Sequence, residues 1–190
     1  MAWIDMIDEA KAEGKLAELY DKLTGPQNDK VAHVLKVHSL NPDVLEDHLN
    51  LYKTIMYGKS NISRKQREMV ATFVSNINEC HYWINHHGAG LQKLIRDKEE
   101  AKKIFSDILE DYNKADISEK ERAMLCYTEK LTKKPSSVEK EDLKELKNMG
   151  LSDRDILDLN QVVSYFNYVN RIAEGLGIEL EEGKEEIFEK

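Results

Sequence analysis

Apolar residues recur along the chain at spacings of three and four, and no alternation of apolar and polar residues persists. This spacing is the period of an amphipathic α-helix, whereas alternation would indicate strands. Three prolines and short clusters of Gly, Asn and Ser separate the periodic stretches. The pattern therefore predicts an all-α fold.

The first helix is expected from about Asp8 to Leu23. It should end before Gly25-Pro26, because this pair cannot continue a helix, and a loop through Asp29 should follow. The buried stripe of this helix is predicted to comprise four apolar residues, Leu16, Leu19, Tyr20 and Leu23.

A short helix over Val31 to Leu40 is predicted next. Asn41 then suits an N-cap and Pro42 suits the first turn of the following helix. That helix should continue to about Tyr57, where Gly58 stops it.

Later helix starts are indicated by a Ser followed three residues later by Glu or Gln, which is the capping-box pattern. The pairs are Ser63 with Gln66, Ser118 with Glu121, and Ser136 with Glu139.

Three windows contain no formally charged residue, although charged residues make up 34% of the chain: Met69 to Asn78, Cys80 to Gln92, and Leu159 to Asn170. These windows are predicted to form the centre of the fold. Asp97 to Asp111 and Glu139 to Lys147 carry dense mixed charge, as outer helices do. Residues 1–180 are expected to form one domain, followed by an acidic tail over 181–190 that is frayed or packed on a partner and carries no visible chemistry.

Charge and cysteine usage narrow the classes of function. The formal net charge of -8 argues against nucleic acid as a partner. No apolar run is long enough for a membrane span and the start lacks the features of a signal peptide, so no membrane association and a cytoplasmic location are expected. Two cysteines, Cys80 and Cys126, are too few for a disulfide framework.

Reactive side chains concentrate between Glu68 and Gly88. If a helix begins near Cys80, positions 80, 83, 84, 87 and 91 share one face, so Cys80 and His87 lie two turns apart. A thiol in a first helical turn has a lowered pKa and becomes nucleophilic. Glu68 borders a charge-free span and is a candidate to relay protons.

Glu68, eleven residues, Cys80-His-Tyr-Trp83, three residues and His87 resemble the motif of AhpD-like proteins of the carboxymuconolactone decarboxylase superfamily. The flanks are similar to its peroxidase-related branch: His38-Ser-Leu-Asn-Pro42, Arg67-Glu68-Met69 and Tyr165-Phe-Asn-Tyr-Val-Asn-Arg171. The resemblance covers most of the chain and implies an AhpD-like helical bundle. It also implies that Glu68 and His87 move protons for a redox-active cysteine pair.

One position departs from this motif, because Trp83 stands where the family has its second cysteine. No local disulfide can form, so a thiol cycle would need an external thiol, or Cys126 if folding brings it near. Trp83 is expected to fill the space beside Cys80 and to narrow any pocket there.

Other readings of the same residues stay open. His86 and His81 lie off the stripe of Cys80 and His87, so surface or core roles suffice for them. A metal site built from Cys80, His87 and Glu68 does not match the spacing of familiar zinc motifs, and no metal or cofactor is expected. Cys126 is expected in the core, and so is an aromatic set that could instead line a pocket, Tyr165, Phe166 and Tyr168.

Three functions follow from these alternatives. The first is a peroxidase-related antioxidant protein in which Cys80 attacks a hydroperoxide, Glu68 and His87 handle protons, and an external thiol is the reductant. The second is a cofactor-free lyase or decarboxylase-like enzyme in which His87 and Glu68 act as acid and base on a small-molecule substrate. The third is a catalytically silent oligomeric scaffold or sensor. The resemblance implies a homo-oligomer, with dimer, trimer and hexamer open.

Overall fold

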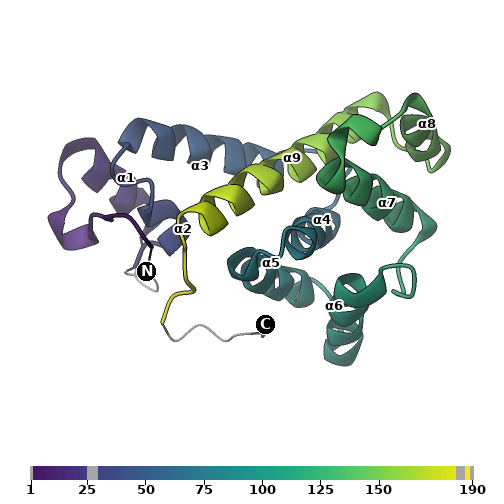
Figure 1. Ribbon diagram of the computed structural model, residues 1–190, viewed down its shortest axis with the longest axis horizontal. Helices are drawn as coiled ribbons and strands as arrows, with labels where there is room; N and C mark the ends of the chain where they lie inside the picture. Colours follow the sequence, from purple (N-terminus) through teal and green to yellow (C-terminus); the bar gives the residue numbers. More distant parts are fainter. Residues whose placement is uncertain (1, 25–29, 183–186, 189–190) are drawn as a thin grey trace.

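A computed structural model describes residues 2–24, 30–182 and 187–188. Nine α-helices and two short 3-10 helices, with no strand, make up the secondary structure of these ranges (Figure 1). The α-helices are α1 (Gly14–Leu23), α2 (His33–Lys36), α3 (Pro42–Tyr57), α4 (Arg64–Ile77), α5 (His81–Lys93), α6 (Lys98–Asp111), α7 (Glu119–Lys133), α8 (Lys140–Asn148) and α9 (Asp153–Gly175). The 3-10 helices are η1 (Glu9–Lys11) and η2 (Pro135–Ser137). The predicted all-α class is confirmed.

The centre of the fold is α4, which packs against α5, α7 and α9. Every residue from Arg67 to Ser75 on α4 is buried, so this helix has no face left for solvent over more than two turns. The long helix α9 also packs against α3 and α7 (Figure 1). The charge-free windows thus lie on α4, α5 and α9, at the predicted centre. The two charged residues that α4 also buries, Arg67 and Glu68, precede its window and have hydrogen-bond partners.

The outer helices have the predicted amphipathic character. On α6, Ala101, Ile104, Phe105 and Ile108 are buried at spacings of one, three and four, and α8 buries Leu146. A smaller apolar cluster joins α1 to α3 through Leu16, Leu19, Tyr20, Val31, Leu45 and Leu49.

Several predicted helix ends are confirmed. Asn41 caps α3, with its side chain accepting from the Val44 N–H, and Gly58 ends the same helix. Capping boxes at Ser63 and Ser118 start α4 and α7. A further box at Ser152, which the sequence analysis did not identify, starts α9.

Two predicted helices are shorter than expected. The first helix does not run unbroken from Asp8 to Leu23, because Ala12 and Glu13 are extended and Gly14 takes a φ of +53°, which glycine adopts without steric cost. The helix expected over Val31 to Leu40 is helical only over His33–Lys36. The expected end at Gly25-Pro26 and the loop through Asp29 lie outside the described residues.

The box predicted at Ser136 with Glu139 does not form. Pro135 begins η2, and Val138 after it is extended. Instead, Glu139 caps α8 in a box with Asp142, whose carboxylate also accepts from Lys130 Nζ at 2.7 and 2.9 Å. The start of α8 is therefore set by a contact to α7 as well as by the local sequence.

Among residues 2–24, 30–182 and 187–188, no helix has both the length and the apolar character needed to cross a bilayer.

Candidate functional site

A tight turn between α4 and α5 places Cys80. Glu79 takes a left-handed φ of 55°, and the Cys80 N–H reaches back to the Ser75 carbonyl at 2.9 Å. This bond spans the turn in the manner of a Schellman motif and satisfies a carbonyl at the end of α4. Cys80 is thereby fixed as the N-cap of α5, where it is fully buried.

Glu68 on α4 and His87 on α5 form a buried pair. His87 Nδ1 lies 2.5 Å from Glu68 Oε2, and the two residues are 4% and 2% exposed. The other carboxylate oxygen, Oε1, accepts from the Arg64 guanidinium one turn earlier on α4. These three side chains, Arg64, Glu68 and His87, are called the acid–base chain below.

Burial raises the pKa of the Glu68 carboxyl, but the charges and hydrogen bonds of His87 and then of Arg64 outweigh it, so the pKa lies below its ordinary value. Arg64 is itself held by the Met56 carbonyl at 2.9 Å and the Tyr57 hydroxyl at 3.0 Å. Glu68 is therefore kept as a carboxylate that orients the imidazole of His87.

The second ring nitrogen of His87, Nε2, is buried without a hydrogen-bond partner among the described residues. A histidine held through Nδ1 by a carboxylate presents Nε2 as the nitrogen that can exchange a proton with a reacting group. In the acid–base chain, His87 Nε2 is therefore the atom that can exchange a proton with a reacting group.

Trp83 lies between Cys80 and His87 along α5, three residues after the first and four before the second. Its indole stacks on the His87 ring at a centroid distance of 5.1 Å and an angle of 25°. Its Nε1–H donates to the Val169 carbonyl at 3.2 Å, and only 6% of the residue is exposed. Trp83 is therefore packed between α5 and α9, and its indole covers the imidazole of His87.

His86 takes part in a second cluster of side chains. Its ring stacks on Tyr82 at 4.3 Å, and its Nε2 lies 3.1 Å from Glu181 Oε2. Glu181 Oε1 also accepts from the Tyr82 hydroxyl and from the His33 N–H, both at 2.8 Å. Although burial raises it, the pKa of Glu181 is strongly lowered by these donors, His86 first among them.

A neighbouring side chain on α5 binds the end of the described chain. Asn85 Oδ1 accepts from the N–H groups of Ile187 and Phe188 at 2.7 and 3.0 Å, and its Nδ2 donates to the Phe188 carbonyl at 3.1 Å. Glu181 and Asn85 together form what is called the C-terminal clamp below. The acidic tail was expected to lack chemistry, and the sequence analysis missed Glu181 because its partners are distant in the chain.

Cys126 was expected in the core, but it is exposed on α7. It lines a surface pocket with Tyr112, Glu145 and Met149. The two thiols therefore lie in opposite surroundings, one fully buried and one open to solvent.

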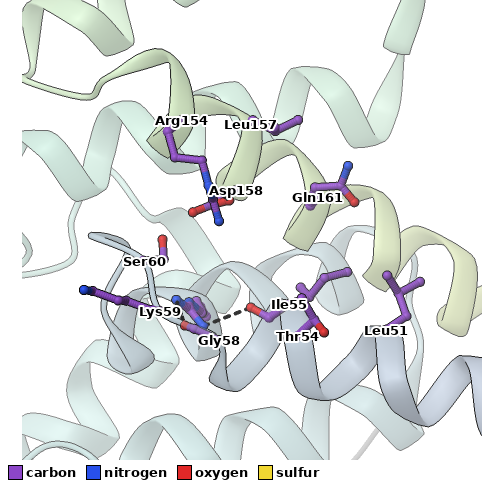
Figure 2. A pocket seen from close by; sticks show the side chains of 11 residues that line it. Leu51, Thr54, Ile55, Gly58, Lys59, Ser60, Arg154, Leu157, Asp158 and Gln161 are labelled. Carbon is purple, nitrogen blue, oxygen red and sulfur yellow. Dashed lines mark hydrogen bonds and ion pairs between the residues drawn. The ribbon is translucent and has the colours of Figure 1, made fainter.

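Figure 2 shows a pocket of about 190 Å³ between α3 and α9. Two of its lining residues, Arg154 and Asp158, lie one turn apart on α9, and Arg154 Nε donates to Asp158 Oδ1 at 2.8 Å. Beneath it, the buried Arg67 donates to the carbonyls of Ile62, Ile55 and Gly58 at 2.8–3.0 Å and so satisfies the end of α3. This pocket includes none of the predicted site residues.

A second cavity, of about 340 Å³, is lined mainly by aromatic and apolar residues, among them Trp83 and His86. No group of three or more His, Cys, Asp or Glu side chains in the described parts of the chain is arranged to hold a metal ion. The site offers a thiol, a carboxylate-held imidazole and aromatic walls.

Comparison with known proteins gives the same fold. A family model described as the carboxymuconolactone decarboxylase family matches residues 42–125, which include Glu68, Cys80 and His87. Among curated proteins, none matches. A solved peroxidase-related protein from Silicibacter sp. TM1040 is 28% identical, with a TM-score of 0.83 and coverage of 95% of this chain and 92% of that one.

Two further structures share the fold at lower identity. An AhpD-core, peroxidase-related protein from Ralstonia eutropha JMP134 is 23% identical, with a TM-score of 0.83 and coverage of 95% and 93%. The debrominase Bmp8 is 19% identical, with a TM-score of 0.70 and coverage of 88% and 87%.

Proposed function

Because residues 42–125 match the model of the carboxymuconolactone decarboxylase family and the chain has the fold of AhpD-like peroxidase-related proteins, we propose that it belongs to this family and is a one-cysteine peroxidase. Cys80 would be the redox thiol, and the acid–base chain would move the protons. The observation that supports this best is the 2.5 Å contact between Glu68 and His87 on the helix that Cys80 begins.

The reaction divides into two stages. The Cys80 thiolate attacks one oxygen of a hydroperoxide, the O–O bond breaks, and the alcohol or water leaves with a proton supplied through His87, giving a sulfenic acid. An external thiol then displaces water from that sulfur to form a mixed disulfide. A second external thiol then attacks the mixed disulfide, which releases the Cys80 thiol and joins the two external thiols in a disulfide.

Trp83 gives this cycle its dependence on an external thiol. The position one turn from both Cys80 and His87, where a second thiol could resolve the sulfenic acid, holds an indole. Cys80 is also fully buried, which favours small oxidants over bulky ones. Since thiol cycling requires a reducing compartment, the protein is expected to work in the cytoplasm.

A second function has its own support. Within the described part of the chain His87 Nε2 has no hydrogen-bond partner while Nδ1 is fixed by Glu68, which is the arrangement of a general acid or base. In a lyase or decarboxylase-like reaction His87 would exchange a proton with a small carbon acid, and Cys80 would be incidental.

Oxidation kinetics distinguish these functions. With hydrogen peroxide and an organic hydroperoxide, the intact mass of wild type should rise by one oxygen at Cys80, and Cys80→Ser should abolish peroxide consumption, whereas the exposed-thiol control Cys126→Ser should retain it. An inert Cys80 that becomes reactive only in Trp83→Cys would refute the one-cysteine cycle. If both thiols are inert and no His87-dependent activity is found, a silent scaffold is left.

A homo-oligomer is part of the proposal. The outer faces of α3 and α9, which lie side by side, expose apolar residues that include Leu51 at 45%, Leu157 at 53% and Tyr168 at 45%. Such a stripe suits a second copy of the chain. Light scattering should give a multiple of the 22.0 kDa chain mass, and Leu157→Glu should reduce it.

A further inference from the structure

The cavity of about 340 Å³ beside Trp83 is called the aromatic cavity below, because rings form a large part of its wall. Its lining comes from α1, the stretch around α2, α3, α5 and α9. Five aliphatic residues and two histidines contribute to it, together with five aromatic residues, Tyr52, Tyr57, Tyr82, Trp83 and Tyr165. Elements that are far apart in the sequence thus meet around one apolar cavity, which is the usual form of a small-molecule site.

The polar atoms of three wall rings are bonded within the protein. Trp83 Nε1 donates to a carbonyl of α9 at 3.2 Å, and the Tyr82 hydroxyl donates to Glu181 at 2.8 Å. The Tyr165 hydroxyl lies 3.3 Å from Nε2 of the buried His48. These residues therefore offer an occupant mainly apolar ring surface, and they need no hydrogen bond from it.

The wall rings also pack against one another, so the cavity exists before a ligand arrives. The centroid of the Tyr52 ring lies 5.9 Å from those of both Tyr57 and Tyr165. On α5, the Tyr82 and Trp83 rings meet edge to face at 5.3 Å. Because the walls are ordered in advance, a ligand does not have to spend binding energy on arranging them.

The charges around the aromatic cavity favour an uncharged occupant. None of the described residues that line it is acidic, and Lys53, its one lysine, is exposed to water, where an ion pair contributes little. The Arg64 guanidinium lies over the Tyr57 ring at 3.9 Å from the centroid, so a cationic ligand would meet a like charge at this wall. An anionic ligand would lose its hydration and would face the negative faces of the rings.

The volume sets the size of the occupant. A cavity of roughly 150 Å³ accommodates benzene, and this one measures about 340 Å³. One or two fused rings therefore fit.

We propose that the aromatic cavity is a binding site for a neutral, apolar aromatic molecule of one or two rings. The walls of this site include Tyr57, which holds Arg64, and Trp83, which covers His87, so the site adjoins both ends of the acid–base chain. Binding does not depend on the proposed thiol chemistry, since neither Cys80 nor His87 lines the cavity.

The two tryptophans of the chain provide the test, because Trp83 lines the cavity and Trp3 does not. In nuclear magnetic resonance spectra of the ¹⁵N-labelled protein, naphthalene should shift the indole N–H signal of Trp83 with a Kd of about 0.1 mM or below. The signal of Trp3, which is 78% exposed, should stay in place. Two charged analogues, 2-naphthoate and 2-naphthylmethylammonium, should each bind at least about tenfold more weakly than naphthalene.

Variants that fill the aromatic cavity test its position. Ala32→Phe adds a ring at a half-buried wall residue and should weaken naphthalene binding by at least about tenfold. Leu35→Trp, at a second half-buried wall residue, should do the same and replaces Ala32→Phe if that variant does not fold. Ala17→Phe on α1 is the matched control, since Ala17 is also half-buried but does not line the cavity, and it should bind as wild type does.

Three results would overturn the proposal. The first is a Trp83 signal that naphthalene leaves unshifted, or a Trp3 signal that shifts equally. The second is tighter binding of either charged analogue. The third is a folded filling variant that binds naphthalene as tightly as wild type.

Discussion

Glu68 Oε2 and His87 Nδ1 meet at 2.5 Å between the two most central helices, and Arg64 holds the other oxygen of the same carboxylate. A carboxylate this deeply buried is tolerable only because both of its oxygens have hydrogen-bond partners, His87 on one and Arg64 on the other. Stability and chemistry therefore depend on the same three side chains.

Removing the charge of Glu68 should destabilise the protein. Glu68→Gln is expected to lower the free energy of unfolding at pH 7 by about 3 kcal/mol, because the guanidinium of Arg64 loses its buried partner. Glu99→Gln on the exposed face of α6 is the matched control and should change it by less than about 0.5 kcal/mol. Urea unfolding measures both, and equal effects would contradict the buried ion pair.

The pH dependence of this difference follows from the lowered pKa of Glu68. A carboxyl with a folded-state pKa below its unfolded value of 4.5 stabilises the fold above pH 4.5 and loses that contribution as the pH falls through the folded value. The stability gap between wild type and Glu68→Gln should therefore be constant from pH 7 to about 5 and narrow below 4.5. A gap that widens as the pH falls would contradict the lowered pKa of Glu68.

Gly90 faces the same carboxylate. A Cβ at this position would lie 2.9 Å from Glu68 Oε2 and 3.0 Å from its Cδ, so Gly90→Ala must displace the acid–base chain. We expect a loss of about 1–2 kcal/mol in unfolding free energy, although alanine is the better helix former.

Gly175 on α9 is the control for this substitution, because a Cβ there meets nothing within 4 Å. Gly175→Ala should be neutral or stabilise by about 0.5 kcal/mol. If both glycines respond alike to alanine in thermal unfolding, the contact with Glu68 is not what constrains position 90.

Trp83 should contribute both packing and a hydrogen bond. Trp83→Phe retains a ring but loses the donor to the Val169 carbonyl and some volume, with an expected cost of about 2 kcal/mol. Trp3→Phe is the comparison, since Trp3 is 78% exposed and should matter by less than about 0.5 kcal/mol. Chemical denaturation measures both variants, and equal denaturation midpoints would contradict the predicted contribution of Trp83.

The C-terminal clamp should depend on one carboxylate. In Glu181→Gln the amide of His33 loses a charged acceptor, so its hydrogen exchange should accelerate by about tenfold or more. The adjacent Glu182→Gln, which removes an exposed charge, should leave the rate unchanged. Because its pKa is lowered, Glu181 should protect this amide down to below pH 4.5, and loss of protection at higher pH would contradict the clamp.

The parts of the fold that sequence could predict are those set by neighbouring residues. Asn41, Ser63 and Ser118 cap helices through bonds to residues three positions away, so their sequence patterns suffice. The charge-free windows identified α4, α5 and α9 because a stretch without charge can be buried on all sides, whereas Arg67 and Glu68 on α4 are buried only with partners.

The parts that sequence could not predict depend on distant partners. Glu181 reads as one more acid in an acidic tail, and its role follows from His86, which is 95 positions earlier. Arg64 and His48 likewise look like ordinary surface residues of amphipathic helices. The sequence pattern also mispredicted two helix starts. A left-handed glycine, Gly14, interrupts the first predicted helix, and a contact from Lys130 to Asp142 helps to set the start of α8.

The stacking of Trp83 on His87 also makes the site visible to spectroscopy. The chain has two tryptophans, and the other one, Trp3, is largely exposed. In a Trp3→Phe protein all indole emission would come from the ring that covers the imidazole, and a protonated imidazole quenches such emission more strongly than a neutral one. Fluorescence of that protein would then report on the two imidazoles beside Trp83, His87 at 5.1 Å and His86 at 6.0 Å, without a label or a substrate.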